Sequence, residues 1–185
     1  RFHPSHWLLQ LSRTQWNYIV SLTADAIVAM GMLTWSVATM DRPGLLLPVG
    51  AVAVLGYTLT EYSWHRFLFH WRKASPALTE GHAYHHRSPR APLALPFFNA
   101  IPHVLVVWSL GRWMVGPSLG AFFCGMWFAG YASYGILHHL MHAGRSQSRI
   151  VTILRRNHEV HHQQPMRNFG VTSPLWDHVF GTYSP

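Results

Sequence analysis

The stretch Leu119–His142, LGAFFCGMWFAGYASYGILHHLMH, decides the fold of this chain. It starts as an apolar run of membrane-spanning length, since about 20 residues rising 1.5 Å each cross roughly 30 Å of hydrocarbon. It ends in His138 and His142, which are four residues apart and therefore share one face of a helix. The pattern indicates a membrane helix with potential metal ligands at one end.

Three further segments have the length and apolarity of membrane spans, although Pro96, Pro102 and His103 interrupt one of them. Short connections at residues 41–44 and 116–117 predict antiparallel hairpins. Tryptophans and leucines mixed with Arg13 near the N-terminus predict an interfacial helix. We expect one all-α domain over residues 1–185, an integral-membrane bundle of about four transmembrane helices. The predicted parts are an interfacial helix at 1–16, spans at 18–40, 45–62, 93–115 and 119–140, and metal-binding segments at 63–92 and 141–185.

The composition of the 185 residues also favours a membrane protein. Charged residues make up 11% of the chain and hydrophobic residues 49%, whereas soluble domains are about one quarter charged. The net charge of +8 suggests nucleic acid or an anionic membrane surface as a partner. The sequence contains no nucleic-acid-binding motif, so no nucleic-acid partner is expected. Cys124 is the only cysteine, which excludes a disulfide framework and a thiolate metal site.

Lysine and arginine are distributed unequally between the two sides of the predicted bundle. Twelve lie on the side of the N-terminus and the two metal-binding segments, and two lie on the other side, so the first side is predicted to be cytoplasmic. The twelve are Arg1, Arg13, Arg66, Arg72, Lys73, Arg87, Arg90, Arg145, Arg149, Arg155, Arg156 and Arg167, against Arg42 and Arg112. The chain is therefore predicted to be a multi-pass membrane protein with its histidine clusters at the cytoplasmic face.

Ten of the fifteen histidines fall into four tight clusters. Neutral imidazole is the commonest protein metal ligand, and ten imidazoles can hold two metal ions. On a helix that turns about 100° per residue, the histidines of 82–86 occupy an arc of roughly 100°, and those of 158–162 repeat this geometry. His65 and His70 are about 140° apart on an ideal helix, so they need a helix end between them or serve different metals. The predicted ligands are His65, His70, His82, His85, His86, His138, His142, His158, His161 and His162.

An all-imidazole site leaves positive charge that a bridging hydroxide or nearby carboxylates would offset. Carboxylates can accept the far ring N–H of a ligating histidine. The candidates for this role are Glu61, Glu80, Glu159 and Asp177. Residues 158–162 also match the H-E-x-x-H signature of zinc metalloproteases, but that interpretation leaves the other clusters unexplained. A metal or haem carrier is a further alternative, and it predicts ligands spread through the membrane depth.

Several polar residues fall outside this scheme. Asp25 lies within the first span, where a carboxylate is costly, and both a functional and a structural role are open for it. His103 is expected to be a hydrogen-bonded core histidine. His3 and His6 are expected to lie at the interface, and neither His139 nor His178 is expected to be a ligand.

The quoted clusters resemble those of the fatty acid hydroxylase and sterol desaturase superfamily of membrane-bound non-haem di-iron enzymes. The similarity covers roughly residues 45–183 and includes residues 61–70, 82–86 and 158–162, together with the tail NFGVTSPLWDHVFGT at 168–182. Residues 130–142 resemble a segment of the fatty acid 2-hydroxylases, and on that match His138 and His142 are ligands and His139 is not. Gly135 departs from the pattern, which has an acidic residue there, and so does Ala143, where a second histidine is common.

The resemblance implies a monooxygenase that hydroxylates a lipid acyl chain, in particular a fatty acid or ceramide at carbon 2. It implies two iron ions and dioxygen as co-substrate, although zinc binds imidazole sites readily and can replace iron in a purified sample. Some family members carry a fused cytochrome b5 domain. Its absence from this sequence implies a separate electron donor, such as a cytochrome b5-like protein, a ferredoxin or a reductase. A desaturase or C-4 methyl oxidase of the same superfamily is the alternative.

Overall fold

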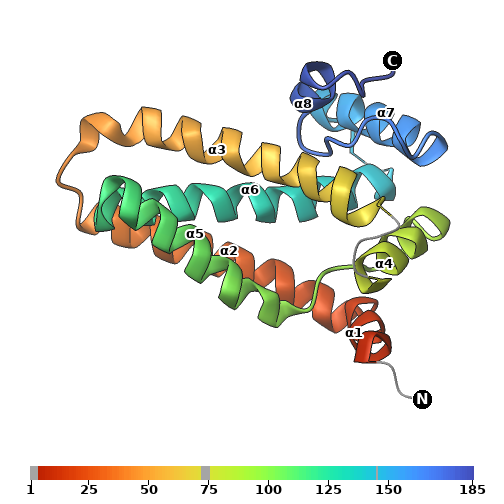
Figure 1. The fold of residues 1–185 in the computed structure, drawn as a ribbon, viewed down its shortest axis with the longest axis horizontal. Helices are drawn as coiled ribbons and strands as arrows, with labels where there is room; N and C mark the ends of the chain where they lie inside the picture. Colours follow the sequence, from red (N-terminus) through yellow and green to blue (C-terminus); the bar gives the residue numbers. More distant parts are fainter. Residues whose placement is uncertain (1–3, 72–75, 145) are drawn as a thin grey trace.

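A computed structural model describes residues 4–71, 76–144 and 146–185, and every regular element in them is helical (Figure 1). The all-α prediction is therefore confirmed for these residues. Arg1, His3, Arg72, Lys73, Arg145 and the side chain of His6 lie outside the described part. The α-helices are α1 (Pro4–Ser12), α2 (Gln15–Ala38), α3 (Leu46–Ser63), α4 (Pro76–Arg87), α5 (Ala100–Val115), α6 (Pro117–Ala143), α7 (Arg149–Gln163) and α8 (Leu175–Val179).

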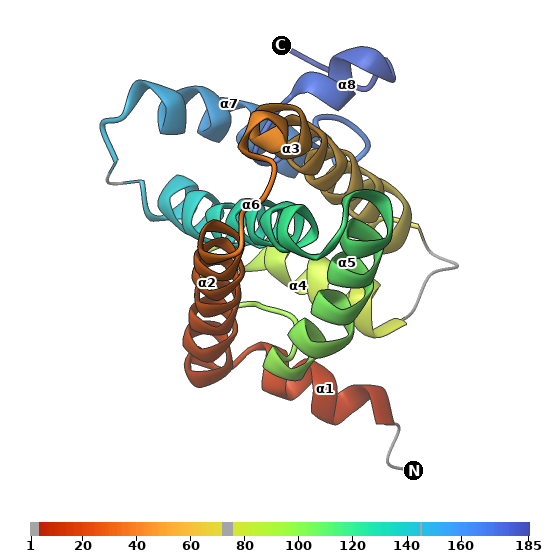
Figure 2. The ribbon, with the colours of Figure 1, turned by 90° about the vertical axis from the view of Figure 1, so that its left-hand side faces the viewer.

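Helix α6 is the centre of the bundle. It packs against α2, α3 and α5, which surround it in the view along the bundle (Figure 2). Small residues allow the close approach: a Cβ atom on Gly120 would lie 2.5 Å from the backbone nitrogen of Arg112 on α5. Leu119, Cys124 and Phe128 are fully buried in this core. The first half of α6 thus forms the core of the bundle, whereas Ser133, Ile136 and His139 in its second half are exposed.

Two helical segments of the described chain are long and apolar enough to cross a membrane, Gln15–Ala38 and Pro43–Phe69. The predicted span at 93–115 was wrong in its first part, because helix α5 begins only at Ala100. Pro96 precedes a short 3-10 turn, Phe97–Asn99, and residues 92–96 have no regular structure. Helix α5 is thus about 24 Å long at 1.5 Å per residue. The N-terminal segment also differs from prediction, since α2 already begins at Gln15.

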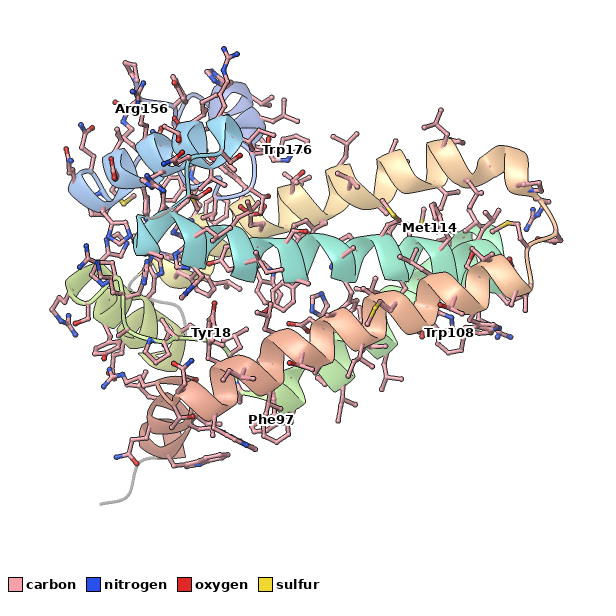
Figure 3. The ribbon with its side chains drawn as sticks, turned by 180° about the vertical axis from the view of Figure 1, so that it is seen from behind. Tyr18, Phe97, Trp108, Met114, Arg156 and Trp176 are labelled. Atoms are coloured by element: carbon pink, nitrogen blue, oxygen red, sulfur yellow. The ribbon has the colours of Figure 1, made fainter. Side chains whose placement is uncertain are left out.

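The outer surfaces of α2, α3 and α5 expose large apolar side chains, including Met30, Val37, Leu47, Val106 and Trp113. An apolar exterior of this extent is typical of a lipid-facing surface. Figure 3 shows Trp108 and Met114 on this bundle, with Arg156 and Trp176 at the other end of the molecule. Helices α1, α4, α7 and α8 gather at that other end, where the C-terminus also lies (Figure 1).

Helix α3 does not stop at Ser63 but continues into one π-helical segment, Trp64–Phe69. In a π-helix the hydrogen bonds join residues five apart, so such residues lie nearly above one another. His65 and His70 have this spacing. Neither alternative considered from the sequence, a helix end between them or separate metals, is what the structure has, since a change of helical pitch brings both side chains to one face and into one histidine group.

Candidate metal centre

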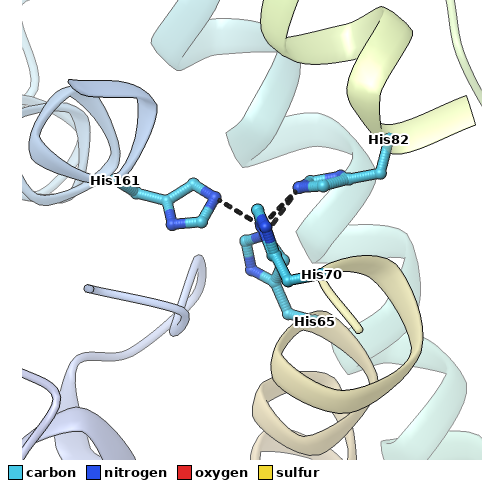
Figure 4. Close-up of side chains that lie close together, drawn as sticks. All are labelled: His65, His70, His82 and His161. Atoms are coloured by element: carbon cyan, nitrogen blue, oxygen red, sulfur yellow. Dashed lines mark hydrogen bonds between the residues drawn. The ribbon is translucent and has the colours of Figure 1, made fainter. Parts of the chain in front are cut away.

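The ten clustered histidines come together at the end of the bundle, from the π-helical segment, α4, α6 and α7. Two groups of four have ligand nitrogens that all lie within 4.8 Å of one another. The first group is His65, His70, His82 and His161, and the second is His85, His138, His142 and His158. Figure 4 shows the first group converging from three separate elements. Such convergence suits a metal ion, because each imidazole offers one nitrogen lone pair.

The two remaining histidines extend these groups. The Nε2 atom of His86 lies 2.9 Å from that of His82 and 3.1 Å from that of His161. The Nε2 atom of His162 lies 3.1 Å from those of His85 and His158. Each group thus gains a fifth imidazole, and the rings of His86 and His162 meet with centroids 4.4 Å apart. The three histidines of α4, in residues 82–86, therefore contribute to both groups, and so do the three of α7, in residues 158–162. Neither set of three holds a metal alone.

The nitrogen contacts fit metal binding better than hydrogen bonding. The Nε2 atom of His82 lies 3.1, 2.8 and 2.9 Å from the Nε2 atoms of His65, His70 and His86. A neutral imidazole has one N–H, so these contacts cannot all be hydrogen bonds from one nitrogen. Lone pairs facing each other at such distances repel unless a cation lies between them. An all-imidazole set of donors is suited to iron or zinc.

Two of the rings are oriented by backbone carbonyl groups. The Nδ1–H of His65 donates to the carbonyl oxygen of Phe169 at 2.5 Å, and that of His161 donates to the carbonyl oxygen of Arg167 at 2.7 Å. Because a carbonyl only accepts, Nδ1 must carry the hydrogen, which leaves the Nε2 lone pair directed into the first group. The candidate carboxylates therefore do not accept the Nδ1–H groups of these two rings, which go to backbone carbonyls instead.

Two of the candidate carboxylates bind the loop that follows α7 instead of the imidazole rings. Asp177 is fully buried and accepts hydrogen bonds from Phe169 N, Gly170 N and Thr182 Oγ1 at 2.7–2.8 Å. Glu61 accepts from Val171 N, Thr172 N and the hydroxyl of Thr172. These two carboxylates fix the segment that carries the orienting carbonyls. Glu80 and Glu159 are exposed.

Burial lowers the pKa of the clustered imidazoles, since desolvation disfavours the charged ring and neighbouring histidines add repulsion. The pKa falls to about 4 for His70, His142 and His162 and to about 3 for His161. It is also far below its usual value for His82, His85 and His158. The cluster is therefore neutral at pH 7, which is the state that binds a metal.

A cavity of about 160 Å³ adjoins both groups and continues into the bundle. Its lining includes His65 and His82 of the first group, His85 and His138 of the second, and Asp25 and His103 deeper inside. Asp25 thus faces the interior of the bundle. His103 accepts a hydrogen bond from Trp127 Nε1 at 3.1 Å, as expected for a core histidine, but it also borders the cavity.

Other predicted features are also located by the structure. Neither His139 nor His178 belongs to a metal-type group in the described chain, and the ring of His178 stacks on Tyr183 at 4.0 Å. In the H-E-x-x-H stretch the glutamate is exposed while its histidines share the larger cluster, an arrangement that argues against a protease site. The orienting carbonyls of Arg167 and Phe169 were not foreseen, because a backbone carbonyl leaves no signal in residue type.

The comparisons with known proteins agree with this geometry. The chain is 32% identical to the dihydroceramide fatty acyl 2-hydroxylase FAH2 of Arabidopsis thaliana over 98% of its own length and 79% of the relative's. It is 26% identical to the fatty acid 2-hydroxylase of Mus musculus, over 98% of this chain and 52% of that protein. A solved structure of full-length scs7p, with only its hydroxylase domain visible, superposes with a TM-score of 0.77 at 25% identity, covering 95% of this chain and 69% of that one. The sequence model of the family described as fatty acid hydroxylase matches residues 50–182, and the chain belongs to that family.

Proposed function

We propose that this protein is a membrane-bound di-iron oxygenase that hydroxylates a lipid acyl chain at carbon 2, with dioxygen and external electrons. The observation that carries the proposal is the pair of imidazole groups beside a cavity that enters an apolar bundle. The names of the relatives, which are fatty acid and dihydroceramide 2-hydroxylases, support the position of the reaction and the lipid class.

In this proposal the ten clustered histidines hold two iron ions, five imidazoles to each. When bound, the iron ions supply the activation of dioxygen and the oxidation of an unactivated C–H bond. The chain holds the rings neutral and oriented, through burial and through the carbonyls of Phe169 and Arg167. It also places the lipid, because Leu9, Phe69 and Leu95 line the cavity next to the histidines and exclude water.

The topology belongs to the same proposal. Residues 1–185 form one hydroxylase domain whose helices α2, α3, α5 and α6 cross the membrane, with the histidine end at the cytoplasmic face. The unequal distribution of lysine and arginine supports this orientation. Electrons come from a separate cytoplasmic donor of the cytochrome b5, ferredoxin or reductase type. The exposed cations Arg87 and Arg90 lie on the histidine side and are available to an acidic donor.

Mass spectrometry of lipids from cells with and without the protein tests this function. We expect an acyl species that gains one oxygen atom, and His86→Ala should abolish it. A species that loses two hydrogen atoms would instead indicate the desaturase alternative. No change in any lipid, with the protein present and iron-loaded, would contradict the oxygenase proposal.

A further inference from the structure

The deep part of the cavity contains an unexplained polar side chain. Asp25 on α2 is 4% exposed, and its Oδ1 atom has no hydrogen-bond partner within the described chain. Ser21, one turn earlier on the same helix, borders the same cavity. A buried carboxyl group without a partner is costly in a membrane helix, so it persists where it has a use. Asp25 does not contact the histidine cluster, so the metal centre does not account for it.

A hydrogen-bond donor also borders the cavity. Trp127 Nε1–H donates to His103 Nε2, and a ring that accepts at Nε2 must carry its hydrogen on Nδ1. His103 therefore presents an N–H group. The ring of Tyr131 lies beside it, with centroids 5.6 Å apart, and also borders the cavity. The deep cavity thus offers both an acceptor and a donor.

The size of the cavity limits what it can hold. A volume of about 160 Å³ is below the 300–1,000 Å³ typical of sites for whole small ligands. The cavity therefore takes a short part of a lipid, and the long hydrocarbon has to leave it. A buried carboxyl oxygen without a partner is satisfied by a neutral donor such as a hydroxyl or an amide N–H, whereas a second carboxylate there would add buried negative charge without a partner.

We propose that Asp25 and His103 bind the neutral polar part of the lipid substrate, a hydroxyl- or amide-bearing group, and so select such lipids over free fatty acids. This inference rests on the proposed function, because it assumes that a lipid lies against the histidine cluster. The specificity comes from the acceptor, since the Oδ1 atom of Asp25 has no hydrogen-bond partner among the described residues.

The wall between this polar part and the metal centre is aromatic. On α6 the rings of Tyr131 and Tyr134 stack with centroids 6.5 Å apart, and those of Tyr134 and His138 with centroids 5.5 Å apart. Seven residues of helix separate Tyr131 from His138, about 10 Å at 1.5 Å per residue. The cavity wall at Tyr131, beside His103, thus lies about that far along α6 from the predicted ligand His138.

The test measures equilibrium binding to the metal-free, detergent-solubilised protein, followed by the fluorescence of Trp64 and Trp127, which line the cavity. The probes are an N-acyl sphinganine, the N-acyl alkylamine of the same chain lengths, which lacks the hydroxyls, and the free fatty acid. The variants are Asp25→Leu, which is more apolar and suits a membrane helix, and the near-isosteric Asp25→Asn. Ser36→Ala is the matched control, since Ser36 is buried on the same helix and does not line the cavity.

Wild-type protein should bind the N-acyl sphinganine most tightly. Asp25→Leu should weaken that binding by about tenfold, because the hydrogen bond to the Asp25 side chain is lost. Asp25→Asn should weaken it less, and Ser36→Ala should not change it. Equal affinity of wild type for the three lipids, or no effect of Asp25→Leu on the preference, would overturn the inference. Because no metal is present, this result is independent of whether cells oxidise any lipid.

Discussion

Replacing Asp177 with asparagine is expected to weaken metal binding at the first histidine group and to leave the second group unchanged. The Asp177 carboxylate accepts the N–H groups of Phe169 and Gly170 on its two different oxygens. Asparagine keeps one oxygen, so one of these N–H groups would face an amide NH₂ group. The neighbouring carbonyls of Phe169 and Arg167 orient His65 and His161, and both of these rings belong to the first group.

The magnitude follows from these contacts. Losing a hydrogen bond to a buried charge costs about 1.5–3 kcal/mol, and leaving a buried N–H unpaired costs about 1–3 kcal/mol more. A loss of roughly 3–5 kcal/mol in the free energy of unfolding leaves most domains folded, since they have about 5–15 kcal/mol. Loss of outer-shell orientation typically weakens metal affinity by about 10- to 100-fold. Within the described residues, the hydrogen bonds and ring contacts that join this loop to the histidines go to His65, His70 and His161 of the first group, so the affinity of the second group should not change.

The assay is a metal titration of metal-free protein, with bound metal counted by elemental analysis after gel filtration. Wild type should bind two ions with similar affinity, and Asp177→Asn should bind one tightly and one weakly. Asp41→Asn is the control, because Asp41 is an exposed carboxylate whose ion-pair partner is its neighbour Arg42. Equal weakening of both ions in a folded variant, or no weakening at all, would refute the link from Asp177 through the loop to one site.

Four further results are expected. Gly170→Ala should also weaken the first site without any change in charge, because its Cβ would lie 2.0 Å from the carbonyl oxygen of Ser173. Metal titration measures this, and a wild-type affinity would contradict the packing argument. Glu61→Ala should release the C-terminal segment from α3 and lower the free energy of unfolding by about 3 kcal/mol, detected as faster proteolysis after residue 163. Gly120→Leu should separate α5 from α6 and lower the melting temperature by several degrees, whereas Ser133→Ala on the exposed face of α6 should not. The metal-free protein should lose stability as the pH falls from 6.5 to about 4. In this pH range the histidines of the unfolded chain take up protons, while His70, His142 and His162 stay neutral in the folded protein. A melting temperature that does not change with pH in this range would contradict the prediction.

Local sequence pattern was enough to predict part of this structure. Apolar length and short turns indicated helical hairpins, and histidine spacing indicated convergent rings on α4, α6 and α7. The relation of His65 to His70 was not predictable from an ideal helix, because the pitch changes in the π-helical segment and residue type does not report pitch. The start of α5 was also misplaced, since hydropathy does not register that Pro96 and a 3-10 turn shorten the helix.

The division of the histidines into two groups was equally hidden from sequence. Neighbours such as His82 and His85 lie on one helix yet join different groups, because their partners come from distant elements. The role of the orienting carbonyls of Arg167 and Phe169 was hidden from sequence in the same way, because it depends on the path of the loop that carries them. Sequence therefore indicated which residues gather, and tertiary packing determined how they are shared.

The location of α7 has a consequence for biosynthesis. Each histidine group needs a side chain from this helix, His161 for the first and His158 for the second. Helix α7 follows all the helices of the central bundle along the chain. Neither group is complete until α7 has left the ribosome and returned to the bundle. Metal capture is thus a late step of assembly, and a chain truncated before α7 should insert its helices without acquiring a complete site.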